Sequence, residues 1–280
     1  MASQSDLFAD RSERGKLRFR GPQRAWFLHQ VLTQAFEDIA PGEARAAAMI
    51  TPHGRMTGFL EVVATEDALL AHFEPELRAV LPEELRRYLF ATQAEVEDVT
   101  EDMGLVLVGG PNWRDAAAGI EATLHPTTSL GAPSAYLWVE RAAVPEVLET
   151  LEDRGLQPAS EELLEAIRIA HGAPRWGRDM DARTLPQEAG IDSVAVHYDK
   201  GCYLGQEAMA KIHFRGRVNR SLRRLQTAGP LEPGAEVTLA GEKVGKVTSA
   251  SDGRALAILR RTVEDGAEVE VGSVEATVTG

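Results

Sequence analysis

The sequence predicts an α+β protein with two mixed domains followed by a small antiparallel β-barrel. Before about residue 216, segments with apolar residues at helical spacing alternate with short β-rich runs. From about Ser221 onward the helical spacing disappears, and valine-rich runs are separated by glycines. We therefore expect an N-terminal α+β domain over residues 1–108, a second α+β domain over 109–215 and the barrel over 216–280, with the first two free to interleave in space.

The first expected domain opens with a helix. Pro22 suits its first turn, Pro41-Gly42 would end it, and its apolar positions recur at helical spacing: Phe27, Leu28, Val31, Leu32, Ala35 and Phe36. Two short β-rich runs around Thr65-Glu66-Asp67 predict a hairpin, with strands over 59–64 and 68–73. Further elements are expected in this order: a helix over 75–90 interrupted at Pro82, then strands over 94–99 and 104–108.

The second domain repeats this pattern in shorter form. The expected elements are a helix near 112–119, a strand over 135–140, and helices near 144–154 and 160–170. Pro145 and Ser160 stand where a first-turn residue and an N-cap residue belong. In the barrel region, an Ala240-Gly241 turn would join two strands, and alternating valines predict further strands toward the C-terminus.

Composition and charge limit the function. The chain has 280 residues, 44% of them apolar, and a net charge of −13, which argues against a generic nucleic-acid binder. No stretch approaches the ~18 apolar residues of a membrane helix, and the N-terminal residues lack the apolar run of a signal peptide. We therefore expect a cytoplasmic protein with no membrane partner. Two basic stretches, residues 11–24 and 200–224, predict a site for a small anion.

The segment KGCYLGQE contains the only cysteine, Cys202. A single thiol excludes an internal disulfide and the several thiolates of an iron-sulfur cluster, so no metal site is expected. Gly201 and Gly205 bracket the thiol, and the residues after Gly205 have the composition of a helix. On a turn before a helix N-terminus, backbone N–H groups and Lys200 would favour the thiolate. The alternative is that Cys202 is a small buried hydrophobe and Tyr203 a core residue.

Three segments resemble one protein family. KGCYLGQE is similar to the signature of YgfZ-type folate-binding proteins, and LRFRGPQRAWFLHQVLTQ with TPHGRM resembles the N-terminal part of the same superfamily. RIAHGAPRWGRDMDARTLPQEAG resembles a segment shared by the YgfZ type and the glycine cleavage T-protein, an aminomethyltransferase. Together the segments cover roughly a third of the chain, in the correct order.

The resemblance implies three domains around a central hole that holds tetrahydrofolate or a derivative. It implies a catalytic role for Cys202 and Lys200. The candidate cofactor-binding residues are of three kinds. Aromatic residues would line the pterin slot, acids or amides would hydrogen-bond to the edge of the pterin, and cations would bind the glutamate tail. Following the resemblance, these are Tyr203, Gln206, Glu207, Glu188, Arg215, Arg217 and Trp176, with Lys200 as a further tail contact and Phe214 as a further wall.

The sequence departs from its relatives at two points. In the superfamily a glutamate that would hold the pterin edge commonly follows Arg-Ile, but here Ala170 follows Ile169, so either Glu188 supplies the acid or folate is held differently. The aspartate pair of the aminomethyltransferases aligns with Thr57 and Gly58, neither of which acts as an acid or base at neutral pH. Glycine cleavage activity is therefore not expected, and enzymatic activity of another kind stays open.

Three functions remain in competition. The preferred hypothesis, implied by the resemblance, is a folate-binding accessory protein for the maintenance or repair of iron-sulfur enzymes, including tRNA-modifying ones, with Cys202 reactive toward client proteins. The second is a folate-dependent one-carbon transferase or demethylase. The third is a non-catalytic module that binds RNA or an acidic protein through residues 211–224, although the net charge makes direct nucleic-acid binding the weaker expectation.

Overall fold

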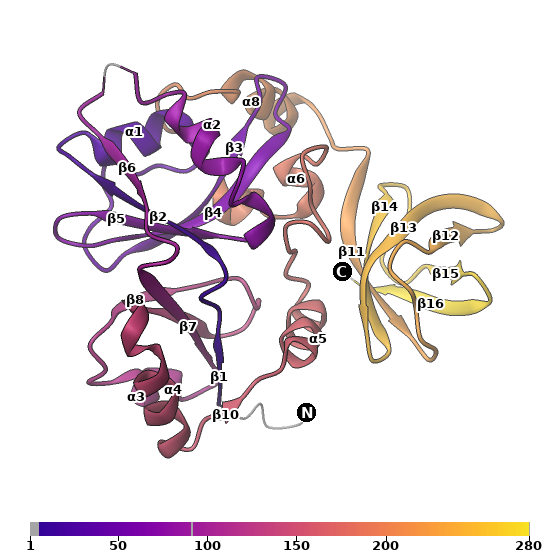
Figure 1. Ribbon diagram of the computed structural model, residues 1–280. Helices are drawn as coiled ribbons and strands as arrows, with labels where there is room; N and C mark the ends of the chain where they lie inside the picture. The colour runs from indigo at the N-terminus through magenta and orange to yellow at the C-terminus, as the bar shows by residue number, and fades with distance from the viewer. Residues whose placement is uncertain (1–5, 91, 280) are drawn as a thin grey trace.

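The computed structural model describes residues 6–90 and 92–279, apart from the side chain of Arg215. Figure 1 shows a body of two β-sheets and a β-barrel that stands to one side of it. The body contains one five-stranded sheet with the strand order β3-β4-β5-β2-β6 and a second with the order β10-β1-β7-β9-β8. The six strands of the barrel close in the order β11-β14-β13-β12-β15-β16. The α+β fold class with a C-terminal antiparallel barrel is thus confirmed.

The first sheet is antiparallel throughout. Its strands are β2 (Gly15–Arg20), β3 (Ala44–Ile50), β4 (Met56–Ala64), β5 (Leu69–Phe73) and β6 (Glu95–Asp98), and its helices are α1 (Arg24–Val31), η1 (Pro75–Leu77) and α2 (Leu81–Arg86). The hairpin predicted around Thr65-Glu66-Asp67 is confirmed as β4 and β5.

Two predicted helices of this region are shorter than expected. α1 ends at Val31 because Leu32 is extended, and the apolar residues that follow are buried in irregular chain instead. Pro82 does not interrupt one long helix: it lies in the first turn of α2, where a missing N–H costs nothing. The tertiary contacts of these apolar residues, rather than helical spacing alone, decide the outcome.

The second sheet combines distant parts of the chain. Its strands are β1 (Leu7–Asp10), β7 (Met103–Gly109), β8 (Thr123–Pro126), β9 (Ser134–Glu140) and β10 (Gln157–Pro158), and its helices are α3 (Trp113–Ala117), η2 (Arg141–Ala143) and α4 (Val144–Asp153). β1 lies between β10 and β7, so the chain starts in this sheet, crosses to the first sheet and returns. One buried apolar cluster contains residues of both sheets, among them Val63, Leu70, Leu105 and Trp138.

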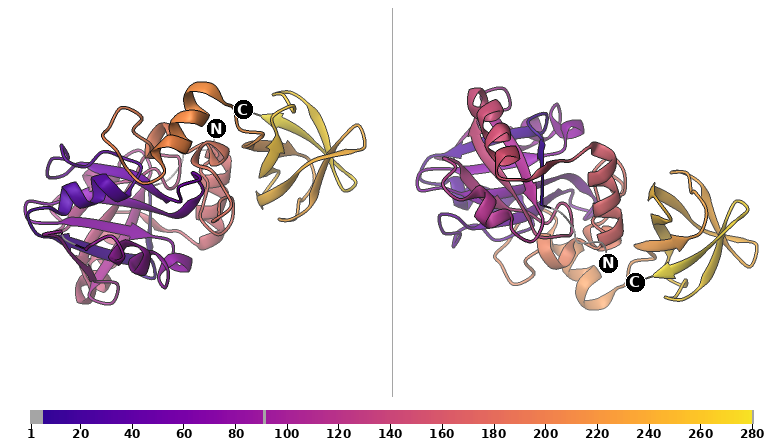
Figure 2. Two further views of the ribbon diagram at one scale, coloured as in Figure 1. Left: turned by 90° about the horizontal axis from the view of Figure 1, so that it is seen from above. Right: turned by 90° about the horizontal axis from the view of Figure 1, so that it is seen from below.

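The segment between the second sheet and the barrel carries short helices. They are α5 (Glu161–His171), α6 (Pro186–Ala189), α7 (Asp192–Ala195) and α8 (Gln206–Arg215). Ser160 caps α5 as predicted, because its side chain accepts a hydrogen bond from the N–H of Leu163, and Gly172 ends the helix with φ +74°. Two further views show α5 between the sheets and the barrel (Figure 2).

The barrel has an apolar core of its own, which contains Leu225, Val237, Leu259 and Val278. Its strands are β11 (Arg220–Thr227), β12 (Glu236–Leu239), β13 (Glu242–Ser251), β14 (Arg254–Arg260), β15 (Glu268–Val271) and β16 (Val274–Thr279). The predicted turn between the first pair of strands is present, with positive φ at Ala240 and Gly241. No helix in the described residues is long and apolar enough to cross a lipid bilayer.

Candidate ligand-binding site

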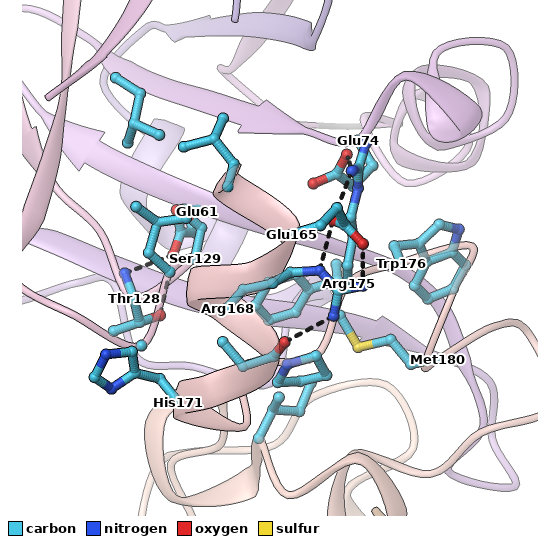
Figure 3. A pocket seen from close by; sticks show the side chains of 18 of the residues that line it. Glu61, Glu74, Thr128, Ser129, Glu165, Arg168, His171, Arg175, Trp176 and Met180 are labelled. Atoms are coloured by element: carbon cyan, nitrogen blue, oxygen red, sulfur yellow. Dashed lines mark hydrogen bonds and ion pairs between the residues drawn. The ribbon is translucent and has the colours of Figure 1, made fainter. Parts of the chain in front are cut away.

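A cavity of about 310 Å³ lies beside α5, between both sheets and the loop that follows the helix. Figure 3 shows its side chains arranged around α5. Trp176 and Met180 form part of its wall and lie side by side, because the N–H of Gly177 donates to the carbonyl of Met180 across a tight turn. Other apolar walls come from Leu107, Leu130, Leu164, Ile191 and Val194. The cavity therefore has a mostly apolar lining with charged groups at particular points.

Arg175 is the centre of the charged part. Its guanidinium donates to Glu74 at 3.1 Å, to Glu165 at 3.0 Å and to Glu161, so it joins the first sheet to α5 (Figure 3). Burial alone would lower the pKa of Arg175, but the three carboxylates raise it above its ordinary value. Arg168 also holds Glu165 by two hydrogen bonds of 2.6 and 2.5 Å. The acids on α5 are thus ionised and fixed in position.

Arg14 extends this network into the first sheet. Its guanidinium donates to Glu74 at 2.5 Å and to Nδ1 of His72 at 3.1 Å, and it lies 5.5 Å from the ring centre of Tyr136. Burial would raise the pKa of Glu74, but the neighbouring Arg14 and Arg175 lower it below its ordinary value. Glu74 therefore bridges two guanidinium groups as a buried anion.

Glu61, His72 and His125 form a buried group whose composition suits a metal ion. However, Nδ1 of His72 accepts from Arg14, and Nδ1 of His125 accepts from the indole N–H of Trp138 at 3.3 Å. A neutral imidazole that accepts at Nδ1 carries its proton on Nε2, which leaves no lone pair there for a metal. Nε2 of His72 lies 3.3 Å from Oε2 of Glu61, a close contact without the geometry of a hydrogen bond.

The carboxylate of Glu61 is also fully used. Besides its contact with His72, it accepts from the hydroxyl of Thr127 at 2.5 Å and from the N–H and hydroxyl of Thr128 at 3.2 and 3.1 Å. Burial would raise the pKa of Glu61, but these hydrogen bonds and the neighbouring histidines lower it well below its ordinary value. Glu61 thus clamps the loop after β8 onto the first sheet, although it also lines the cavity.

The departure at Ala170 has a structural counterpart. Ala170 does not line this cavity; it lines a groove between α5 and the barrel, together with residues such as Leu225 and Arg254. The acids of α5 that line the cavity are Glu161 and Glu165, which lie about two and a half turns and about one and a half turns earlier in the helix. His171, at the end of the helix, lines both spaces.

Cys202 lies apart from the cavity on the turn before α8. It is exposed, and it is absent from the cavity lining. Lys200 is buried, and its ammonium group donates to three carbonyls at the end of α1, those of His29, Leu32 and Gln34. It also lies 4.5 Å from the ring centre of Tyr203. Lys200 therefore anchors this segment to α1, and the catalytic roles of both residues stay predictions.

Of the seven predicted cofactor-binding residues, the cavity lining contains Trp176 alone. Tyr203 is buried in the core of the first sheet, and Gln206 donates to the carbonyl of Lys200 at 3.1 Å. Glu188 accepts from Arg220 at 2.8 Å and from the N–H of Leu185. The remaining candidates belong to or follow α8: Glu207 in its first turn, Arg217 exposed beyond its end, and Arg215, whose side chain lies outside the described residues.

Sequence reasoning missed Glu74, Tyr136, Glu165 and Arg175 as lining residues. Glu74 directly follows one ordinary β-rich run, and Tyr136 lies within another. No local pattern distinguishes either residue from its neighbours. Arg175 had a signal, because it lies in the segment RIAHGAPRWGRD that carried the family resemblance. Only its pairing with Glu74 after β5 and with two acids of α5 identifies it as the centre of the site.

Comparison with known proteins agrees with this architecture. The family model of the CAF17 C-terminal beta-barrel domain matches residues 220–280. A chloroplastic protein of Arabidopsis thaliana, provisionally named a transferase, is 26% identical over 270 residues, which cover 89% of this chain and 62% of that protein. An aminomethyltransferase of Rubrobacter xylanophilus is 29% identical over 275 residues, covering 86% of this chain and 70% of that protein. The chain thus spans less than two thirds of the Arabidopsis protein.

A solved structure shows the same fold over nearly the whole chain. The glycine cleavage system aminomethyltransferase T of Bartonella henselae matches with a TM-score of 0.87 at 17% identity, over 99% of this chain and 85% of that one. The resemblance drawn from the sequence is thereby confirmed, as similarity to aminomethyltransferases in sequence and in fold. The chain therefore has the fold of a glycine cleavage aminomethyltransferase, and its C-terminal barrel matches the CAF17 C-terminal beta-barrel domain.

Proposed function

We propose that this protein binds tetrahydrofolate or a derivative in the cavity beside α5. The observation that carries the proposal is the lining: an apolar wall with Trp176 faces acids that are held ionised by Arg175 and Arg168. The volume of about 310 Å³ is at the lower end of the range for small-molecule sites. Folate-dependent proteins with this fold support the assignment by analogy.

The residues present fit the chemistry of a reduced pterin. Its ring is flat and partly apolar, which suits a slot beside Trp176 and Met180. Its amino and ring N–H groups need acceptors, and the carboxylates of Glu165 and Glu161 are ionised and partly exposed at 24% and 48%. These two acids would take the place of the glutamate that is absent at Ala170. When bound, the folate supplies a one-carbon carrier; the chain supplies binding and orientation.

The second part of the proposal concerns the client. We infer a supporting role in the maintenance or repair of iron-sulfur enzymes, in which the exposed thiol of Cys202 contacts the client protein. The family of the barrel and the KGCYLGQE segment support this role. An accessible sulfur on a turn can reach another protein, whereas a buried one cannot. The folate cavity and the thiol would then be separate working parts of the molecule.

A titration with reduced folates tests the first part. Calorimetry of the purified protein with tetrahydrofolate should give saturable binding, and Trp176→Leu should weaken it by at least about tenfold, the effect of losing one well-packed aromatic contact. Trp26→Leu is the matched control, because Trp26 is 43% exposed and is absent from the cavity lining. Equal affinity in both variants, or no binding by the wild type, would refute the folate site.

Complementation tests the second part separately. In a deletion strain, Cys202→Ala should fail to restore the activity of iron-sulfur enzymes, while its folate affinity stays unchanged because Cys202 is absent from the cavity lining. Full rescue by Cys202→Ala would remove the thiol from the mechanism.

A further inference from the structure

An aromatic cluster lies on the outside of the protein, at the end of α8. Figure 1 shows α8 at the outer edge of the body, where the chain leads on to the barrel. The ring of His213 stacks on that of Tyr198, with ring centres 3.6 Å apart and an angle of 20° between the planes. Phe214 meets the ring of His213 edge-on at 4.7 Å, and it is 66% exposed. None of the three residues belongs to the lining of the cavity beside α5.

Hydrogen bonds hold the base of this aromatic cluster in place. The side-chain amide of Gln187 donates to the hydroxyl of Tyr198 at 3.2 Å, and that hydroxyl donates to Asp192 at 3.3 Å. His213 is exposed, and in the described residues its side chain has ring contacts but no hydrogen bond or ion pair. A ring that is fixed from one side and open to solvent elsewhere is a place where a further flat ring can stack.

Two cations without an acidic partner accompany the aromatic cluster. Lys211 stands one turn before Phe214 on α8, on the same side of the helix, and Arg217 follows the end of the helix. Both are exposed, and their side chains make no hydrogen bond or ion pair with residues 6–90 or 92–279. Glu207, in the first turn of α8, is the one acid between residues 206 and 220. The end of α8 is therefore locally positive, although the whole chain has a net charge of −13.

A further cation comes from the turn between β3 and β4. This turn packs on α8, because a Cβ atom built on Gly54 would lie 3.4 Å from the Cβ of Ala208. Arg55, in the same turn, is exposed and bonds to the backbone carbonyl of Arg183, which is neutral. The positive charge around α8 thus continues onto the first sheet.

The structure also narrows the basic stretch of residues 211–224. Arg220 is paired with Glu188 at 2.8 Å, and Arg223 is paired with Asp265. Acids of the chain itself already compensate these two charges, so they attract an outside anion less strongly. Lys211 and Arg217, the cations next to the aromatic cluster, are the ones that stay uncompensated.

We propose that the aromatic cluster and the cations Arg55, Lys211 and Arg217 form a binding surface for a single-stranded loop of RNA. Rings that stack on bases and cations that bind phosphates are the two parts of a site for single strands. A loop presents unpaired bases over a few nucleotides, which matches a surface built on one short helix. An acidic protein would use the cations but has no flat rings for the stack. The net charge opposes binding along a longer nucleic acid, so contact is confined to this surface.

Binding of a hairpin RNA with an unpaired adenosine loop tests the stacking part. In fluorescence anisotropy, Phe214→Ala should weaken binding by at least about fivefold, the effect of losing one stacked base. Because Phe214 is exposed, its replacement leaves the apolar core unchanged. Phe90→Ala is the matched control, since Phe90 is 90% exposed and lies in the segment after α2, and it should bind like the wild type.

Salt dependence tests the cations separately. Between about 50 and about 200 mM salt, the logarithm of affinity should fall linearly with the logarithm of salt concentration. The double substitution Lys211→Gln and Arg217→Gln should reduce this slope by about 1.4, because each phosphate contact to a single strand contributes about 0.7. Arg20→Gln, which removes an exposed charge at the end of β2, should leave the slope unchanged.

Four results would overturn the proposal: no saturable binding of the hairpin at low salt, equal affinity in Phe214→Ala and the wild type, equal affinity for a fully paired RNA duplex, or tighter binding of poly-L-glutamate than of the hairpin. The last result would assign the surface to an acidic protein. The inference goes beyond the folate site and does not rest on it. Phe214→Ala should bind tetrahydrofolate like the wild type, because Phe214 is absent from the cavity lining, so failure here leaves the folate proposal standing.

Discussion

The two glycines that bracket Cys202 have different structural roles. Gly205 has φ +80°, and a Cβ atom built on it would lie 2.5 Å from the carbonyl oxygen of Thr51. Gly201 has no positive φ, and the nearest atom to such a Cβ is Nε2 of His29 at 3.9 Å. Gly205 is therefore required by the close approach of β3 and by the left-handed turn into α8, whereas Gly201 is not.

Gly205→Ala should destabilise the protein by at least about 2 kcal/mol, from the left-handed backbone and the clash with Thr51. Gly201→Ala should change the free energy of unfolding by less than about 0.5 kcal/mol. Urea unfolding of both variants measures the difference. Equal effects of the two substitutions would show that the turn can rearrange around Cys202.

At the scale of elements, Asp179 joins α5 to the barrel. Its side chain is completely buried and binds Arg168 of α5 at 2.6 Å, together with the hydroxyls of Thr248 and Ser249 of β13 at 2.5 and 2.8 Å. Consecutive side chains of a regular strand point to opposite faces, but the register of β13 shifts between Val247 and Ser249. This bulge allows both hydroxyls to reach the same carboxylate.

Asp179→Asn should destabilise the contact between α5 and the barrel by about 3 kcal/mol or more, because a buried guanidinium loses one of its two carboxylates. Ser249→Ala removes a single hydrogen bond and should cost about 1 kcal/mol. Thermal unfolding measures stability, and limited proteolysis at residues 216–219 reports on the docking of the barrel. A smaller effect for Asp179→Asn than for Ser249→Ala would contradict this order.

At the scale of the whole molecule, the two sheets meet at a group of buried, neutral histidines. Burial lowers the pKa of His72 to about 4 and that of His125 to about 3. In the unfolded chain both would take up a proton below about pH 6.5. The unfolded state therefore binds more protons between pH 6.5 and 4, and the free energy of unfolding falls as the pH is lowered through this range.

The expected loss of stability at pH 5 relative to pH 7 is about 2 kcal/mol per histidine. Denaturant unfolding at both pH values measures it. His125→Asn should be less stable at pH 7, because the hydrogen bond from Trp138 is perturbed, but should lose less stability on acidification. An unfolding free energy of the wild type that is the same at pH 7 and pH 5 would refute the role of these histidines.

Local patterns were enough to predict several features. The β4–β5 hairpin, the N-cap of α5, the glycine-framed turn before α8 and the C-terminal barrel all follow from spacing, caps and turn residues, which act over a few neighbours in the chain. The resemblance of KGCYLGQE and its companion segments to known proteins predicted the fold that the solved structure of an aminomethyltransferase shares. The sequence by itself thus determined the fold class and the arrangement of its local elements.

Only the tertiary structure decided the site. The acids and guanidinium groups around Arg175 come from β-strand ends, α5 and the following loop, so their pairing depends on the crossing of the chain between two sheets. A second space beside Met180, lined by residues 177–184 together with Arg220, Lys246 and Thr248 of the barrel, likewise exists only because the barrel docks there. Ion pairs and cavities depend on distances in space, and residues such as Glu74 and Arg175 are about a hundred positions apart in the chain, beyond the reach of any local pattern.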